Sequence, residues 1–96
     1  RAVSMPVGPI LQAGRVADAV LAALRTLNDD VEAIDRGAYI RVSVPGRCRL
    51  TREAVEEALG APFRLPIDLE AIMPSFQGHL RLDEDEVRWE APGERQ

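Results

Sequence analysis

The chain of 96 residues contains no lysine, one cysteine, one histidine and few aromatic residues. A single cysteine excludes an internal disulfide and is typical of a reducing compartment, so we expect a cytoplasmic location. No apolar run approaches the length of a membrane span, and no leader with a basic start and an apolar centre is visible. We therefore expect neither a secreted nor a membrane-embedded protein.

Acidic residues outnumber basic ones, with 16 against 12, which gives a formal net charge of -4. All the basic residues are arginines, and they are scattered singly between acids rather than gathered in one stretch of sequence. Binding to nucleic acids or to membrane surfaces requires clustered cations. The charge pattern therefore predicts neither kind of partner.

Few residues are suited to catalysis. His79 is the only histidine, and its strand neighbours Gln77 and Arg81 supply neither a nucleophile nor a group to orient the ring. An exposed polar residue, or a contact in a protein interface, is the simpler interpretation of His79. Cys48 falls on the inward side of an expected strand, which is typical of a buried structural cysteine.

Metal and cofactor sites also lack their usual patterns. The acidic run at residues 83–86 has neither the glycine nor the final glutamate of an EF-hand loop. A diiron site of the carboxylate type needs two Glu-x-x-His pairs, which one histidine cannot supply. We therefore expect no catalytic, metal-binding or cofactor-binding residues in this chain, and a function carried by its surface.

The hydrophobic patterns predict one α+β domain over residues 1–96, with flexible tails at 1–6 and 91–96. Two main helices are expected on one face of a mostly antiparallel sheet. The expected elements are a strand at 7–12, a helix at 15–27, strands at 31–36, 39–44 and 47–50, a helix at 52–59 and a hairpin at 75–89. Pro9 favours an edge position for the first strand. The Pro45–Gly46 pair predicts a turn that returns the next strand antiparallel to the previous one. Residues 63–70 fit a strand or a helical turn equally well.

The hairpin at 75–89 is expected at the centre of the sheet. One side of its first strand carries Phe76, Gly78, Leu80 and Leu82, and the other carries Ser75, Gln77, His79 and Arg81. This alternation predicts that Phe76 lies in the core and that Ser75, Gln77 and His79 face outward. Gly78 lacks a side chain on the apolar side, which indicates a bulge or the close approach of another backbone.

Three stretches together resemble the effector, or coupling, proteins of bacterial multicomponent diiron monooxygenases. They are residues 7–14 (VGPILQAG), residues 36–42 (RGAYIRV) leading to 50–63 (LTREAVEEALGAPF), and residues 75–78 (SFQG) preceding 83–89 (DEDEVRW). The likeness is greatest to the toluene-monooxygenase branch, with relatives in phenol hydroxylase and soluble methane monooxygenase. It covers nearly all of residues 7–89.

The resemblance implies a cofactor-free α+β regulator that is not itself an enzyme and is monomeric in isolation. Such a protein docks on the diiron hydroxylase of an aromatic or alkene monooxygenase and couples oxygen activation to substrate hydroxylation. Ser75, Phe76 and Gly78 match the Ser-Phe-x-Gly pattern of the family. The partner-binding residues expected on this basis are Tyr39, Arg41, Ser75, Gln77, Gly78 and His79, although Tyr39 could equally lie at the edge of the core.

Two other functions stay open at this point. A non-regulatory binding module would assemble a larger complex without changing its turnover. A small acid–base enzyme would use His79 with a carboxylate, and replacing His79 by Ala would abolish its activity.

Overall fold

The computed structural model describes residues 5–92. Its helices are α1 (Arg15–Leu27), α2 (Arg52–Leu59) and α3 (Ile67–Glu70). Its strands are β1 (Pro6–Gln12), β2 (Glu32–Asp35), β3 (Tyr39–Pro45), β4 (Arg47–Thr51), β5 (Ser75–Gln77), β6 (His79–Leu82) and β7 (Glu86–Glu90). Among these residues, none of the helices combines the length and the apolar character needed to cross a membrane.

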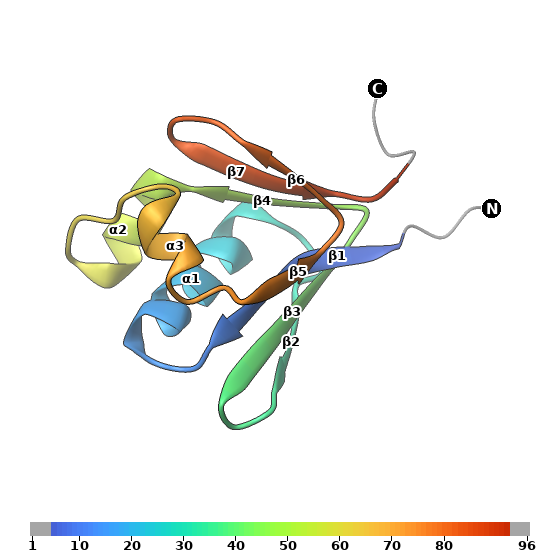
Figure 1. Ribbon diagram of the computed structural model, residues 1–96, viewed down its shortest axis with the longest axis horizontal. Coiled ribbons are helices and arrows are strands. Elements are labelled where there is room, and N and C mark those ends of the chain that lie inside the picture. The colour runs from blue at the N-terminus through green and yellow to red at the C-terminus, as the bar shows by residue number, and fades with distance from the viewer. Residues whose placement is uncertain (1–4, 93–96) are drawn as a thin grey trace.

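The strands form two antiparallel sheets, with the orders β2-β3-β1-β5 and β4-β7-β6. The two sheets diverge from a shared corner, and the helices lie in the space between them (Figure 1). The α+β class is confirmed, but the expected single sheet is wrong because the strands divide between two. The core therefore lies where the inner sides of both sheets meet the helices.

The chain crosses between the sheets twice at this corner, at Gly46 and at Gly78. Both have positive φ angles, 76° and 105°, which favour glycine. The Gly46 N–H donates to the Met5 carbonyl, and the Gly46 carbonyl accepts from the Ala91 N–H. These bonds lead the chain into the second sheet, where β4 pairs with β7. The predicted antiparallel return onto residues 39–44 is therefore wrong.

Strand β1 lies inside its sheet, between β3 and β5, although Pro9 predicted an edge strand. The paired positions of β1 and β3 are residues 6–7 and 10–12 of β1, so Gly8 and Pro9 are left out of the ladder. The missing N–H of Pro9 falls in this gap, and the strand can stay central. The edge prediction was wrong because a local break in pairing is invisible in the sequence.

Both long helices begin and end at the predicted residues. Helix α1 buries one stripe that includes Ala17, Val20 and Leu24. Helix α2 begins after Thr51, whose hydroxyl accepts from the Ala54 N–H at 3.2 Å, and it ends at Gly60 in the left-handed conformation. The ambiguous segment 63–70 contains helix α3, so the helical alternative is the correct one.

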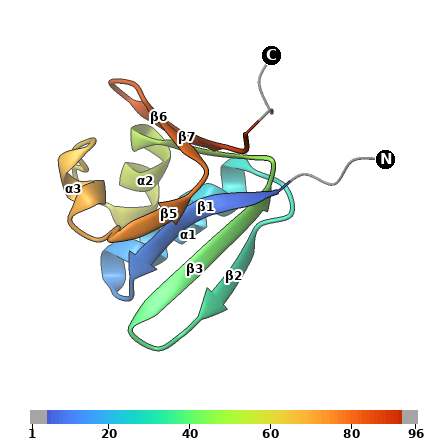
Figure 2. The same ribbon diagram turned by 45° about the vertical axis from the view of Figure 1, so that its right-hand side comes forward.

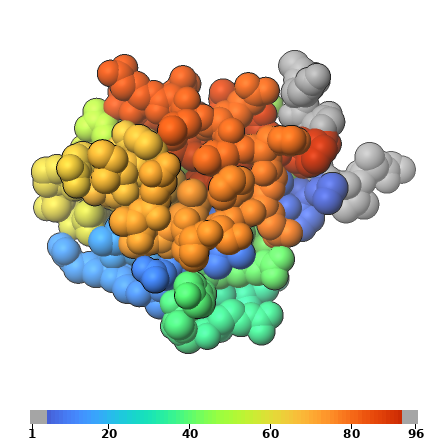
Figure 3. Space-filling model, in the orientation of Figure 1, coloured from blue at the N-terminus to red at the C-terminus, as the bar shows by residue number. Residues whose placement is uncertain are grey.

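The predicted hairpin exists between β6 and β7, with a loop over residues 83–85. Val87 and Trp89 of β7 are fully buried. The placement of the first strand was wrong: β5 and β6 are edge strands, not the centre of a sheet. Their inward residues Phe76, Leu80 and Leu82 therefore lie at the rim of the core and are 38%, 37% and 47% exposed. Figure 3 shows this part of the chain, in orange, running across the surface.

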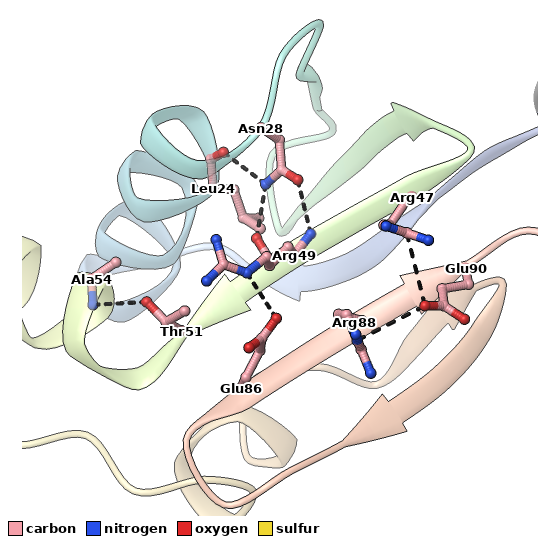
Figure 4. A network of polar contacts seen from close by, with 9 residues as sticks. All are labelled: Leu24, Asn28, Arg47, Arg49, Thr51, Ala54, Glu86, Arg88 and Glu90. Carbon is pink, nitrogen blue, oxygen red and sulfur yellow. Dashed lines mark hydrogen bonds and ion pairs between the residues drawn. The ribbon is translucent and has the colours of Figure 1, made fainter. Parts of the chain in front are cut away.

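Asn28 covers the outer edge of β4 (Figure 4). Its side-chain amide donates to the Arg49 carbonyl at 2.8 Å, and its side-chain oxygen accepts from the Arg49 N–H at 2.9 Å. A single side chain thus satisfies a backbone edge that another strand would otherwise pair with. The flexible tails were expected to include Pro6 and Ala91, but Pro6 belongs to β1 and Ala91 is buried. Residues 1–4 and 93–96 lie outside the described residues.

Candidate partner-docking site

The structure places His79 beside one carboxylate, that of Glu90, but Glu90 is engaged by arginine side chains. His79 is exposed on the edge strand β6, opposite Glu90 of β7. Within residues 5–92, no group of three or more histidine, cysteine, aspartate or glutamate side chains is arranged to hold a metal ion. Two residues of the acidic run 83–86 are engaged by arginines: Asp85 pairs with Arg52 and Glu86 with Arg49, each at 2.8 Å. The geometry gives no support to the acid–base enzyme.

Cys48 is fully buried on β4, as predicted, and is a free thiol. Burial disfavours the thiolate and raises the pKa of Cys48 to about 12, from an ordinary value of 9.0. A thiol that stays protonated at neutral pH is a poor nucleophile. Cys48 is therefore a core residue and no part of a reactive site.

This raised pKa predicts a loss of stability in alkali. Between pH 9 and pH 12 the unfolded chain releases the Cys48 proton and the folded chain retains it, so the free energy of unfolding falls as the pH rises. The expected slope from this group is about 1.4 kcal/mol per pH unit. Urea unfolding at pH 10, 10.5 and 11, inside this window, measures it, with Cys48→Ala as the control that lacks the slope. Identical pH dependence of the two proteins would contradict the assignment.

The outer face of the four-stranded sheet carries most of the partner-binding residues expected from the sequence. Paired residues of antiparallel strands point to the same side of a sheet. Ile34 pairs with Arg41, Arg41 with Ile10, and Ile10 with Ser75, so these residues make one row across all four strands. Tyr39 lies two residues before Arg41 on β3, and so shares this side of the sheet.

We call this surface the docking face and define it by Ile10, Ile34, Tyr39, Arg41, Ser75 and Gln77. Strand β1 joins the two distant segments, because Gln12 pairs with Tyr39 and Gly8 pairs with Gln77. The side chains of Ile34 and Tyr39 are 36% and 43% exposed, and Arg41 and Ser75 are exposed as well. Figure 2 shows the four strands together on one side of the molecule, with helix α1 behind β1.

The structure thus brings four of the six expected partner-binding residues onto one surface: Tyr39, Arg41, Ser75 and Gln77. Gly78 lies at the corner between the sheets, where a Cβ atom would be 2.8 Å from Val7 Cγ1 and 3.1 Å from the Glu90 carbonyl oxygen. Its role in the structure is to permit this crossing. His79 follows on the other sheet, where it shares the outer side with Glu90.

Sequence reasoning missed the two isoleucines of the docking face. Ile10 and Ile34 lie in segments whose apolar residues do not alternate clearly, so their direction could not be predicted from the sequence. Their outward direction follows from the register, which places both beside Arg41. The exposed charge of Arg41, two residues after Tyr39, is a local signal for this side of the sheet.

Comparison with known proteins found consistent relatives. The model of the MmoB/DmpM family matches residues 5–90. The alkene monooxygenase effector subunit of Xanthobacter autotrophicus is 44% identical over 85 residues, which cover 86% of this chain and 83% of that protein. Two chains solved in complexes of phenol hydroxylase with its regulatory protein have similar folds. One has a TM-score of 0.80 and 23% identity, and the match covers 92% of this chain and 99% of the solved chain. The other has a TM-score of 0.73 and 25% identity, and the match covers 88% of this chain and 99% of the solved chain.

Proposed function

Because the chain belongs to the MmoB/DmpM family, we propose that it is the effector of a multicomponent monooxygenase and regulates the hydroxylase of that system. The hydroxylase carries the chemistry, and this chain supplies a surface. The observation that carries the proposal is the family match over residues 5–90, together with a 44% identical effector subunit. We propose further that the hydroxylase has a diiron centre, that the free effector is monomeric and that it acts in the cytoplasm.

The docking face is the proposed contact with the hydroxylase. It combines two exposed apolar residues, Ile34 and Tyr39, with the guanidinium of Arg41 and the polar side chains of Ser75 and Gln77. Tyrosine and arginine often dominate the binding energy of protein interfaces, since each offers a large contact area and a directed polar group. The flat outer side of a sheet suits a partner that presents a broad surface, such as packed helices.

Regulation by docking requires differential affinity. The effector shifts the conformation of the hydroxylase only by binding one state more tightly than the other. A preformed docking face supports such a role, because a sheet held by three ladders loses little conformational freedom on binding.

The proposal is tested by titrating the purified hydroxylase with this chain while the rate of substrate oxidation is followed. We expect the rate to change with increasing effector and then to reach a plateau at a defined stoichiometry. Size-exclusion chromatography of the same mixtures reports complex formation independently. A stable complex whose turnover equals that of the hydroxylase alone would identify a plain assembly module, and the effector proposal would be wrong.

A further inference from the structure

A row of three arginines crosses the outer side of the second sheet. Arg49 of β4 pairs with Arg88 of β7, and Arg88 pairs with Arg81 of β6. Like charges directly opposite on neighbouring strands destabilise a sheet. The stability of the fold therefore offers no reason for this row. The row is also invisible in the sequence, where these arginines are separated by acidic residues.

The adjacent row contains Glu90, a carboxylate that pairs with two of these arginines and with Arg47. Glu90 is 8% exposed and pairs with three guanidinium groups, those of Arg81 at 3.1 Å, Arg88 at 3.8 Å and Arg47 at 3.9 Å. Figure 4 shows Arg47 and Arg88 converging on Glu90, with Arg49 directed at Glu86. One carboxylate neutralises one charge, so most of the positive charge around Glu90 is left uncompensated.

We call this surface the arginine face and define it by Arg47, Arg49, Arg81 and Arg88 with Glu86 and Glu90. Its four guanidinium groups exceed its two carboxylates by two charges, in a chain whose formal net charge is -4. The side chains of Arg47 and Arg81 are both 57% exposed, so their charge is available to a partner. The four guanidinium groups therefore gather on one side of this sheet, with Asp83 of the hairpin loop beside Arg81 and Arg88.

We propose that the arginine face binds an acidic surface on the hydroxylase, as a second contact in addition to the docking face. This inference rests on the proposed function. The two surfaces are continuous along the chain, because Gln77 of the docking face is followed by Gly78 and then by His79, which lies beside Glu90. A charged surface accelerates association and sets the orientation of the complex.

A protein surface fits this face better than nucleic acid does. Phosphate backbones are bound by many cations, and each contact releases a counterion. Here the excess is two charges, and Glu86 and Glu90 lie among the arginines, where they would repel phosphates. A protein partner can place carboxylates opposite the guanidinium groups and avoid the two glutamates.

The test compares the double variant Arg47→Gln/Arg81→Gln with Arg15→Gln/Arg25→Gln. Both remove two positive charges, but the second pair lies on helix α1, where Arg15 and Arg25 donate only to the exposed carbonyl groups of Leu59 and Val31. Binding to the hydroxylase is measured between about 0.01 M and 0.15 M salt, over which the screening length falls from about 30 Å to about 8 Å. Thermal unfolding of each variant shows that it is folded.

We expect the affinity of the unmodified chain to fall with salt. The variant of the arginine face binds roughly tenfold more weakly at low salt and loses most of its salt dependence, while the α1 variant matches the unmodified chain. Equal binding of all three proteins at every salt concentration would overturn this inference and leave the effector proposal intact. Failure of the unmodified chain to bind at all would instead refute the effector proposal.

Two other partners are distinguished in the same series. Sedimentation of the chain alone at low salt reports self-association, and a fluorescent duplex DNA reports binding to nucleic acid. A dimer or a DNA complex that the Arg47→Gln/Arg81→Gln variant abolishes, with unchanged binding to the hydroxylase, would assign the arginine face to that partner and overturn the inference.

Discussion

Replacement of Gly78 by valine is expected to lower the free energy of unfolding by about 3 to 5 kcal/mol. Two causes add together at this position. The backbone φ angle of 105° is rarely adopted by residues with a side chain, and a Cβ atom would meet Val7 Cγ1 at 2.8 Å. A further contact, 3.1 Å from the Glu90 carbonyl oxygen, involves backbone that cannot move aside easily. Because 1 kcal/mol corresponds to about 4–8 °C in a domain of this size, the melting temperature should fall by roughly 15 °C or more.

Gly60→Val is the matched control for this substitution. Gly60 also has a positive φ angle, 74°, but a Cβ atom there would meet nothing within 4 Å. The Gly60→Val variant therefore measures the backbone strain alone, without a steric clash at the new side chain. We expect its free energy of unfolding to fall by less, about 1 to 2 kcal/mol. Equal melting temperatures of the Gly78→Val variant and the unmodified chain would show that the corner between the sheets does not require glycine.

Replacement of both Tyr39 and Arg41 by alanine is expected to weaken binding to the hydroxylase by roughly 100-fold, with little change in stability. Both side chains are exposed on the docking face, so their removal leaves no cavity in the core. The loss arises because an aromatic ring and a guanidinium group would no longer be buried against the partner. Isothermal titration calorimetry with the purified hydroxylase measures the affinity, and thermal unfolding measures the stability.

Ile67→Ala is the control for general loss of exposed apolar area. Ile67 lies on α3, outside the docking face, and is 57% exposed. We expect the Ile67→Ala variant to bind the hydroxylase with an affinity within about twofold of that of the unmodified chain, as is usual for residues outside an interface. An affinity of the Tyr39→Ala/Arg41→Ala variant equal to that of Ile67→Ala would place the contact elsewhere on the molecule.

The sequence predicts the local elements of this fold well. The bounds of α1 and α2 follow from hydrophobic period, from the Thr51 cap and from the glycines at residues 14 and 60, which are all local signals. The inward direction of Ile40, Val42 and Val44 follows in the same way from the alternation on β3. Each of these features depends on residues within a few positions of one another.

The sheet topology could not be predicted because it depends on distant residues. Pro45–Gly46 has the composition of a hairpin turn, but the hydrogen bonds of Gly46 to Met5 and Ala91 direct the chain into another sheet. Pro9 argues for an edge strand until the gap in the β1–β3 ladder is known. Phe76, Leu80 and Leu82 alternate as core residues do, and only the order of the strands shows that they lie at a rim.

In the candidate site, too, the local features could be predicted from the sequence, whereas the features that depend on distant residues could not. The alternation around residues 75–82 directed attention to Ser75 and Gln77, and the resemblance directed it to Tyr39 and Arg41. Their assembly into one face depends on β1, which pairs with both strands. The arginine face was missed for a related reason: Arg49, Arg81 and Arg88 are separated along the sequence and become neighbours only through strand pairing.

The coupling ratio of the hydroxylase, measured as product formed per oxygen consumed, tests the account most directly. It is determined with the hydroxylase and its electron donor alone, and then with saturating amounts of this chain or of the Tyr39→Ala/Arg41→Ala variant. A regulator that binds one conformation of the hydroxylase more tightly should raise the ratio, and the variant should do so only at much higher concentration. A ratio that is the same with and without the unmodified chain, under conditions in which the complex forms, would contradict the effector function.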